Sequence, residues 1–192
     1  MPPRNDAALD FLLSRRSRPA KTLTGPAPDR DALTTLLTAA GRSPDHGKLE
    51  PWRFIVLERA ALQRMAAAVA PVGARLGKDD AEIAKQQSQY ADGQLAVAVV
   101  ISPKPSEKIP AIEQTLSAGA ACLQLLNAAL AAGWGANWLS GWTSHDRDFL
   151  RDQLALADDE SLAGYIFLGT ETSAPPERPR PDIDAITSWV TA

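Results

Sequence analysis

The sequence predicts a mixed fold of helices and short strands within one domain, because two kinds of apolar pattern alternate along it. Helical spacing of apolar residues recurs in four segments, which are 6–15, 28–40, 59–70 and 112–132. Compact apolar runs of strand length occur at 54–57, 95–101 and 162–168. With 192 residues, 45% of them apolar, the chain can bury its own core or form one subunit of an intertwined dimer.

Glycine, proline and capping residues predict where these elements end. The expected helix ends are Pro19, Gly41 as a left-handed cap, the pair Pro71 and Gly73, and Gly133. Ser144 is expected to cap a further helix that runs through Leu154.

Four segments are interpreted from their composition. The run 95–101 is continuously apolar, which favours a strand covered on both faces, and Trp138-Leu139 is expected to end a short strand. Segment 78–94 is polar and predicts an exposed helix or lid of modest order. The proline-rich end of the chain, 171–192, predicts an extended arm with a short amphipathic turn, which could wrap a partner subunit.

Composition argues against several classes of protein. A net charge of −3 and a pI near 5.4 argue against a surface built for nucleic acid or anionic lipid. One cysteine, Cys122, allows no internal disulfide, and His46 and His145 offer no metal-ligand spacing. The N-terminus has no signal-peptide pattern, and the most apolar span, 118–132, is too short to cross a bilayer, so the cytoplasm is the expected location.

The segment Ser14-Arg15-Arg16-Ser17-Arg18 places three guanidiniums and two hydroxyls in five residues. Arginine offers planar, forked donors that match phosphate oxygens, so this segment is suited to hold a phosphate. The alternative is a solvated basic helix end that balances the helix dipole.

Six segments, taken in order, carry a resemblance to a known family. They are Arg15-Arg16-Ser17, Arg42-Ser43-Pro44-Asp45-His46 with Pro51-Trp52-Arg53-Phe54, Ser117-Ala118-Gly119 leading to Gly133, Trp138-Leu139-Ser140-Gly141, Leu168-Gly169-Thr170, and Pro176-Glu177-Arg178-Pro179-Arg180-Pro181. Together they resemble the FMN-dependent nitroreductase family, in particular its compact bacterial NAD(P)H nitroreductases, over nearly the whole chain. The resemblance implies an α+β fold, with a mostly antiparallel central sheet flanked by helices, as an intertwined homodimer with FMN at the interface.

The same resemblance assigns phosphate and flavin contacts. Arg15, Arg16 and Ser17 would hold the FMN phosphate and ribityl oxygens, and Arg180, with Arg178 in the tail, would return to the phosphate. A merely solubilising arm is the alternative for the tail. Arg42 and His46 would contact the flavin, where a cation near the pyrimidine favours the anionic reduced form. For His46 the alternative is a surface histidine beside Asp45.

Two further segments are matched by resemblance. Trp138, Leu139 and Ser140 would line the flavin, although the tryptophan could equally serve core or interface packing. The helix end from Ala128 to Gly133 matches a segment linked to NAD(P) binding, but its composition alone indicates only a terminus of small residues. Cys122, within the same helix, is expected to be an inert buried thiol.

The implied reaction needs no nucleophilic side chain, so no catalytic residue is named. NAD(P)H would deliver hydride to the flavin and leave, and a nitroaromatic, quinone or similar small acceptor would take its place in ping-pong order. A flavin enzyme of different outcome, such as a dehydrogenase or flavin-consuming monooxygenase, and a non-catalytic FMN-binding module remain alternatives. Lys48-Leu49-Glu50 and Leu139 depart from the family pattern and leave the acceptor open.

Overall fold

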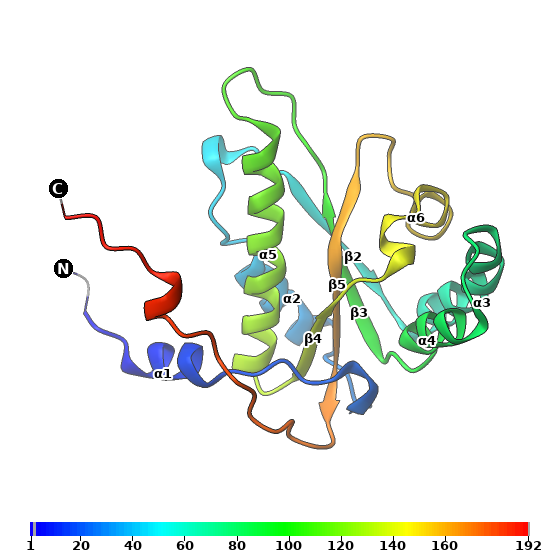
Figure 1. Ribbon diagram of the computed structural model, residues 1–192, viewed down its shortest axis with the longest axis horizontal. Helices are drawn as coiled ribbons and strands as arrows, with labels where there is room; N and C mark the ends of the chain where they lie inside the picture. The colour runs from blue at the N-terminus through cyan, green and yellow to red at the C-terminus, as the bar shows by residue number, and fades with distance from the viewer. Residues whose placement is uncertain (2, 192) are drawn as a thin grey trace.

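A five-stranded sheet forms the centre of the computed structural model, which describes Met1 and residues 3–191 (Figure 1). Its strands are β1 (Leu23–Thr24), β2 (Trp52–Leu57), β3 (Leu95–Ile101), β4 (Gly135–Leu139) and β5 (Ser161–Glu171). The order is β1-β5-β3-β2, β4 also pairs with β5, and each of these pairs is antiparallel. The α+β class and the antiparallel sheet expected from the sequence are confirmed.

Helices cover both faces of this sheet (Figure 1). The α-helices of the described chain are α1 (Asp6–Ser14), α2 (Arg30–Ala40), α3 (Arg59–Arg75), α4 (Asp80–Ala91), α5 (Ala111–Ala131) and α6 (Arg147–Leu154). α2 and α5 lie on one face, and α3, α4 and α6 lie on the other. Among the described residues, no helix combines the length and apolar character needed to cross a membrane.

The central strand β3 divides the core into two clusters. Ala96, Ala98 and Val100 pack with α3, α4 and α6, whereas Val97 and Val99 pack with α2 and α5. Successive strand residues point to opposite faces, so a strand covered by helices on both sides must be apolar at every position. The continuous run at 95–101 was therefore interpreted correctly.

Segment 78–94 forms a helix, which was one of the two structures predicted for it, but the helix is not fully exposed. Asp79 and Glu82 form a capping box at the start of α4, and the helix packs against α3. Its inward positions include Gln86 and Tyr90, which are buried. The polar outer face concealed this buried stripe in the sequence.

The third helix does not break at Pro71, because α3 continues to Arg75. Pro71 is exposed, and the carbonyl left without its helical partner belongs to Ala67, which is also exposed and can bond to water. Gly73 is buried against Ile83, where a Cβ atom would approach within 2.5 Å. Packing of α3 on α4 thus outweighs the local preference.

Two predicted caps were also wrong. Gly41 is right-handed, with φ −65°, because the chain tightens into a further turn in which Arg42 and Ser43 N–H groups donate to the carbonyls of Ala39 and Ala40. Ser144 lies in a short 3₁₀ turn, and the cap of α6 is Asp146, whose carboxylate accepts from the Phe149 N–H at 2.9 Å.

Strand limits were predicted less well than strand positions. β2 begins at Trp52 and β5 extends from Ser161 to Glu171, and the two-residue strand β1 was not expected. β1 is too short for a sequence pattern and exists through its pairing with the end of β5.

Both ends of the chain extend beyond the α5 side of the body (Figure 1). α1 has no buried residue, and within the described residues beyond β5, up to 191, the regular structure is a short 3₁₀ turn, Asp184–Ile186. Within these segments Leu12, Leu13, Trp189 and Val190 are exposed, so their apolar side chains have no cover within one chain.

Candidate functional site

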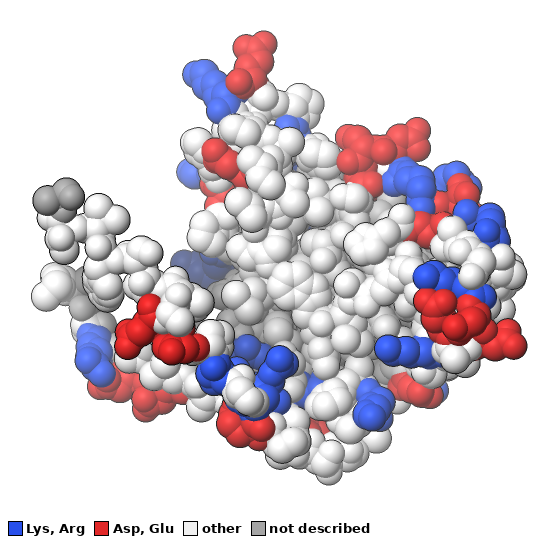
Figure 2. All heavy atoms as spheres, viewed as in Figure 1, with Lys and Arg blue, Asp and Glu red and all other residues white. Residues whose placement is uncertain are grey.

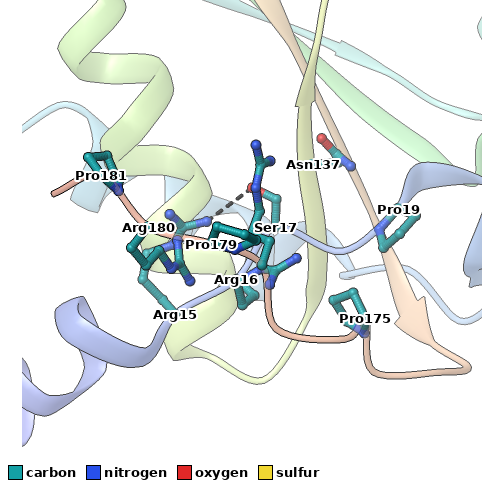
Figure 3. A pocket seen from close by; sticks show the side chains of 10 residues that line it. Arg15, Arg16, Ser17, Pro19, Asn137, Pro175, Pro179, Arg180 and Pro181 are labelled. Carbon is teal, nitrogen blue, oxygen red and sulfur yellow. Dashed lines mark hydrogen bonds between the residues drawn. The ribbon is translucent and has the colours of Figure 1, made fainter.

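Arginine side chains from the two ends of the chain meet around one cavity, here called the arginine cavity. It has a volume of about 550 Å³, and Figure 3 shows its lining. The lining residues are Arg15, Arg16, Ser17, Pro19, Asn137, Pro175, Arg178, Pro179, Arg180 and Pro181. The sequence predicted Arg15, Arg16, Ser17 and Arg180 as one site, and the fold brings these four together.

Strand β4 holds the arginine segment, residues 15–18, in place. The Arg18 N–H donates to the Ala136 carbonyl at 2.8 Å, and the Asn137 side-chain amide donates to the Arg18 carbonyl, also at 2.8 Å. Arg15 donates to the Ser17 hydroxyl at 3.0 Å (Figure 3). The segment after α1 therefore has a defined conformation even though α1 itself is unburied.

The cavity concentrates positive charge. Burial lowers the pKa of Arg15, and the nearby charges of Arg180, Arg16 and Arg18 lower it further. Its Nε is buried and has no hydrogen-bond partner among the described residues. An anion in this cavity would relieve the repulsion between these arginines.

Glu177 partly offsets these charges. Its Oε1 lies 3.3 Å from Arg16 Nη1 and 2.9 Å from Arg180 Nη2. Arg16 also donates to the Pro176 carbonyl at 2.7 Å, and only 15% of its side chain is exposed. The tail thus holds both guanidiniums at the cavity.

Two smaller cavities continue from the arginine cavity along β4. The middle cavity, of about 320 Å³, shares Pro19 and Asn137 with it and is lined mainly by apolar atoms. The amide cavity, of about 200 Å³, shares Lys85 and Gln89 with the middle cavity. The three cavities therefore form a connected row.

Polar side chains of α4 line this row, and the sequence analysis missed them. The side-chain nitrogens of Gln86 and Gln89 are buried without hydrogen-bond partners among the described residues. Lys85 lies beside them on the rim of both cavities. Their only sequence signal was three glutamines in segment 78–94, which was interpreted as an exposed helix or lid.

The predicted strand motif lies only partly along these cavities. Leu139 lines the middle cavity and Ser140 lines the amide cavity. Trp138 points to the other face of β4 and lies against Gly164, where a Cβ atom would come within 2.0 Å of the indole Nε1. Trp138 is thus not placed in the row, as expected when successive strand residues alternate.

Ala128 and Gly133 lie near the C-terminal end of α5 and line none of the cavities described here. Gly133 has φ +83° and accepts the left-handed turn that leads from the helix into β4. The structure gives this glycine a conformational role, and its nucleotide contact stays a prediction.

Arg42 and His46 lie far from the arginine cavity. His46 Nδ1 is 2.6 Å from the carboxylate of Glu113, in the first turn of α5, and Arg42 lines a separate cleft with Trp52. The arginine segment is held at the opposite end of α5, next to β4. From Glu113 to Ala131 the helix rises by about 27 Å. Within one chain the two groups of predicted flavin residues do not meet.

Other reactive groups offer no competing site. Cys122 is buried in α5, and burial raises the pKa of its thiol to about 12, so the expected inert thiol fits the structure. Over the described residues, no three His, Cys, Asp or Glu side chains gather as metal ligands would.

Comparison with known proteins identifies the family to which this chain belongs. The family model "Nitroreductase family" matches residues 12–170, which is most of the chain. The chain belongs to the nitroreductase family. The family assignment made from the sequence motifs is therefore confirmed, and with it the expected class of oxidoreductase enzymes.

Two bacterial relatives are similar in sequence to this chain over most of their length. The chain is 33% identical over 163 residues to "Putative NAD(P)H nitroreductase YdjA" of Escherichia coli, which covers 85% of this chain and 87% of that protein. It is 32% identical over 165 residues to "Putative NAD(P)H nitroreductase" of Haemophilus influenzae, covering 85% and 88%.

Solved structures of nitroreductases share the fold. A nitroreductase-like protein from Bacillus cereus superposes with a TM-score of 0.80 at 20% identity, with both chains fully covered. A nitroreductase from Desulfovibrio desulfuricans, crystallised in complex with FMN, gives a TM-score of 0.74 at 20% identity and covers 98% of this chain and all of that one.

Proposed function

We propose that this nitroreductase-family protein is an FMN-dependent oxidoreductase that transfers hydride from NAD(P)H to a nitroaromatic, quinone or similar small acceptor. The observation that carries the proposal is the row of cavities along β4, which is lined by arginines at one end and by the glutamines of α4 at the other. FMN has a matching polarity, with a dianionic phosphate at one end and a planar ring edged with carbonyls at the other.

The buried donors test this fit. Arg15 Nε, Gln86 Nε2 and Gln89 Nε2 have no partner within the described chain, although buried polar groups are nearly always bonded. All three belong to residues that line the row. The residues present fit FMN in charge and polarity, since arginines line one end of the row and glutamine amides the other.

FMN, when bound, supplies the hydride chemistry, accepting from NAD(P)H and donating to the acceptor in ping-pong order. The arginine cavity would anchor the phosphate through Arg15, Arg16, Ser17 and Arg180. Leu139 would exclude water beside the ring, and the α4 amides would orient its polar edge. The names of the E. coli and H. influenzae relatives support NAD(P)H as donor.

A homodimer completes the proposal. α5 carries one charged residue, Glu113, over its 21 residues, and Figure 2 shows a broad uncharged face over this helix. Ile112, Leu116 and Leu123 are exposed along it at 62%, 65% and 46%. Contiguous apolar surface of this kind marks an interface, and the uncovered ends of the chain would wrap the second copy.

The dimer also accounts for Arg42 and His46. Because α5 separates them from the arginine cavity of their own chain, they would reach a flavin only in the cavity row of a second copy. The site would then be shared, with the phosphate held by one subunit and part of the ring covered by the other. The cytoplasm remains the proposed location.

The test combines binding with reduction. Purified protein is titrated with FMN and then given NADH and, separately, NADPH under anaerobic conditions. Bound flavin that loses its visible absorbance would support the reductase reaction and identify the donor. Bound flavin that stays oxidised with both donors would favour a binding module, and no bound flavin would contradict the proposal.

A variant ties that test to the arginine cavity. Arg16→Ala removes one of the guanidiniums proposed to bind the phosphate, so FMN affinity is expected to fall by about tenfold to 100-fold. The melting temperature of the apo protein is expected to change by less than about 4 °C. Arg30→Ala, at an exposed arginine outside the row, is the matched control and should retain FMN.

A further inference from the structure

A buried pair of hydroxyl groups joins α4 to the segment that follows β4. Tyr90 Oη lies 2.7 Å from Thr143 Oγ1, and both residues are fully buried. Thr143 belongs to the 3₁₀ turn Trp142–His145, which directly follows Ser140 and Gly141 at the amide cavity. The bond therefore links α4 to the turn after β4, and both of these segments line the amide cavity.

The Tyr90 ring does not need its hydroxyl for packing. It stacks on Phe149 with centroids 5.9 Å apart and meets Tyr165 edge-on at 5.7 Å. These aromatic contacts lie within the core cluster between the sheet and α3, α4 and α6. A phenylalanine could make the same contacts, so the hydroxyl has a separate consequence.

Gln86 lies on the same helix as Tyr90 and is also buried. It precedes Tyr90 by one helical turn, so both side chains share the inner face of α4. Its Oε1 is so close to Gly141 that a Cβ atom there would come within 2.0 Å, while its Nε2 is buried without a partner in the described chain. The amide is thus wedged against the turn that Thr143 anchors.

We propose that Tyr90 and Thr143 are positioning residues, whose hydroxyl bond fixes the Gly141–Thr143 turn against Gln86 and so sets the shape of the amide cavity at the ring end of the flavin site. This inference rests on the proposed FMN function. Without the bond, α4 and the turn can separate, and the Gln86 amide can rotate away from the cavity. Flavin binding would then have to order this wall, and the free energy that this ordering requires would lower the affinity.

A nearby tyrosine provides the control for a merely structural effect. Tyr165 is also fully buried in the same cluster, where its ring meets the Tyr90 ring edge-on. Tyr165→Phe removes a buried hydroxyl from the same core and leaves the hydrogen bond between Tyr90 and Thr143 in place. It is expected to leave flavin affinity at the wild-type value.

The experiment measures the affinities of FMN and riboflavin for the full-length protein, together with the apo melting temperature. Tyr90→Phe and Thr143→Val should each weaken both flavins by about tenfold, because the ring is common to them. Thr143→Ser keeps the hydroxyl and should restore binding, and the double variant Tyr90→Phe/Thr143→Val should bind no more weakly than either single variant. Arg16→Ala, in contrast, should weaken FMN alone, since riboflavin has no phosphate.

Wild-type affinity in both Tyr90→Phe and Thr143→Val would overturn the inference, and so would an equal loss in Tyr165→Phe. If only one of the two variants folds, that variant decides the outcome against the Tyr165→Phe control. A wild-type protein that binds neither flavin would overturn the proposed function and this role with it. Flavin binding by the wild type that Tyr90→Phe leaves unchanged would overturn the positioning role alone.

Discussion

The side-chain amide of Asn137 donates a hydrogen bond of 2.8 Å to the main-chain carbonyl of Arg18. The preceding residue of β4, Ala136, accepts from the Arg18 N–H. Two successive strand residues therefore grip the backbone of Arg18 from both of its polar groups. This grip sets the position of the arginine segment relative to the rest of the cavity row, since α1 provides no buried anchor.

Replacement of this amide tests the grip. Asn137→Ala leaves the partly buried Arg18 carbonyl without its donor and is expected to cost about 1 kcal/mol in the free energy of unfolding. FMN affinity should fall by about three- to tenfold, because the guanidiniums lose their fixed starting position. Urea unfolding and an FMN titration measure the two effects, and wild-type affinity would show that the arginine segment is positioned by other contacts.

Glu177 is expected to oppose FMN binding. Its carboxylate lies within 3.3 Å of Arg16 and 2.9 Å of Arg180, so it occupies donors that a phosphate would use. Glu177→Gln removes the competing charge, and FMN should bind about three- to tenfold more tightly. Riboflavin affinity should not change. Glu107→Gln, at an exposed carboxylate outside the site, is the matched control, and weaker FMN binding by Glu177→Gln would instead indicate that Glu177 organises the arginines.

Subunit complementation tests the shared site. Arg16→Ala and Arg42→Ala are each expected to bind FMN weakly as homodimers, because each damages both sites. A heterodimer of the two variants would combine both substitutions in one site and leave the other site intact. Co-expression with two different tags, followed by isolation of the mixed dimer, should therefore recover one tightly bound FMN per dimer. Recovery of no tight site would contradict the arrangement across two subunits.

The pair Arg53 and Glu160 predicts acid sensitivity. Arg53 donates to the two carboxylate oxygens at 2.6 Å each, and the Glu160 side chain is 8% exposed. These hydrogen bonds, opposed by burial and aided by the Ala157 N–H, lower the pKa of Glu160 from 4.5 to about 2. A depressed pKa in the folded state adds stability above pH 4.5, and this stability is lost as pH falls toward 2.

We therefore expect the free energy of unfolding to decrease between about pH 5 and pH 2, by no more than about 2 kcal/mol from this pair, since Arg53 is partly exposed. Glu160→Gln should be less stable at neutral pH and should lose that part of the pH dependence. Urea unfolding at several pH values measures both. An unchanged pH slope in the variant would assign the acid sensitivity to other carboxylates.

Local chemistry made part of the site readable from the sequence. Arg15, Arg16 and Ser17 are adjacent in the chain, so their phosphate-binding character does not depend on the fold. Arg180 could be added only by resemblance, and the fold brings it to the same cavity. Gln86, Gln89 and Asn137 gave no separate signal, because an amide becomes significant only when it is buried without a partner or aimed at a particular carbonyl.

The errors in secondary structure have a common physical cause. Pro71 and Gly73 carry strong local signals for a break, yet the contact of α3 with α4 keeps the helix intact. Segment 78–94 has a polar composition, yet Tyr90 at its inner face is fully buried. In both cases a contact between distant residues outweighed a preference that local sequence expresses by at most a few kcal/mol.

By itself, the sequence determined the approximate positions of most helices and strands, the two-sided burial of 95–101 and the cationic character of the segment after the first helix. These follow from residue periodicity and from the chemistry of neighbouring side chains, which are properties of short stretches of chain. Only the tertiary structure decided that Arg180 meets Arg16, that α4 amides face the end of β4, and that Arg42 lies at the far end of α5. Each of these depends on contacts between residues far apart in the chain, which one-dimensional patterns do not encode.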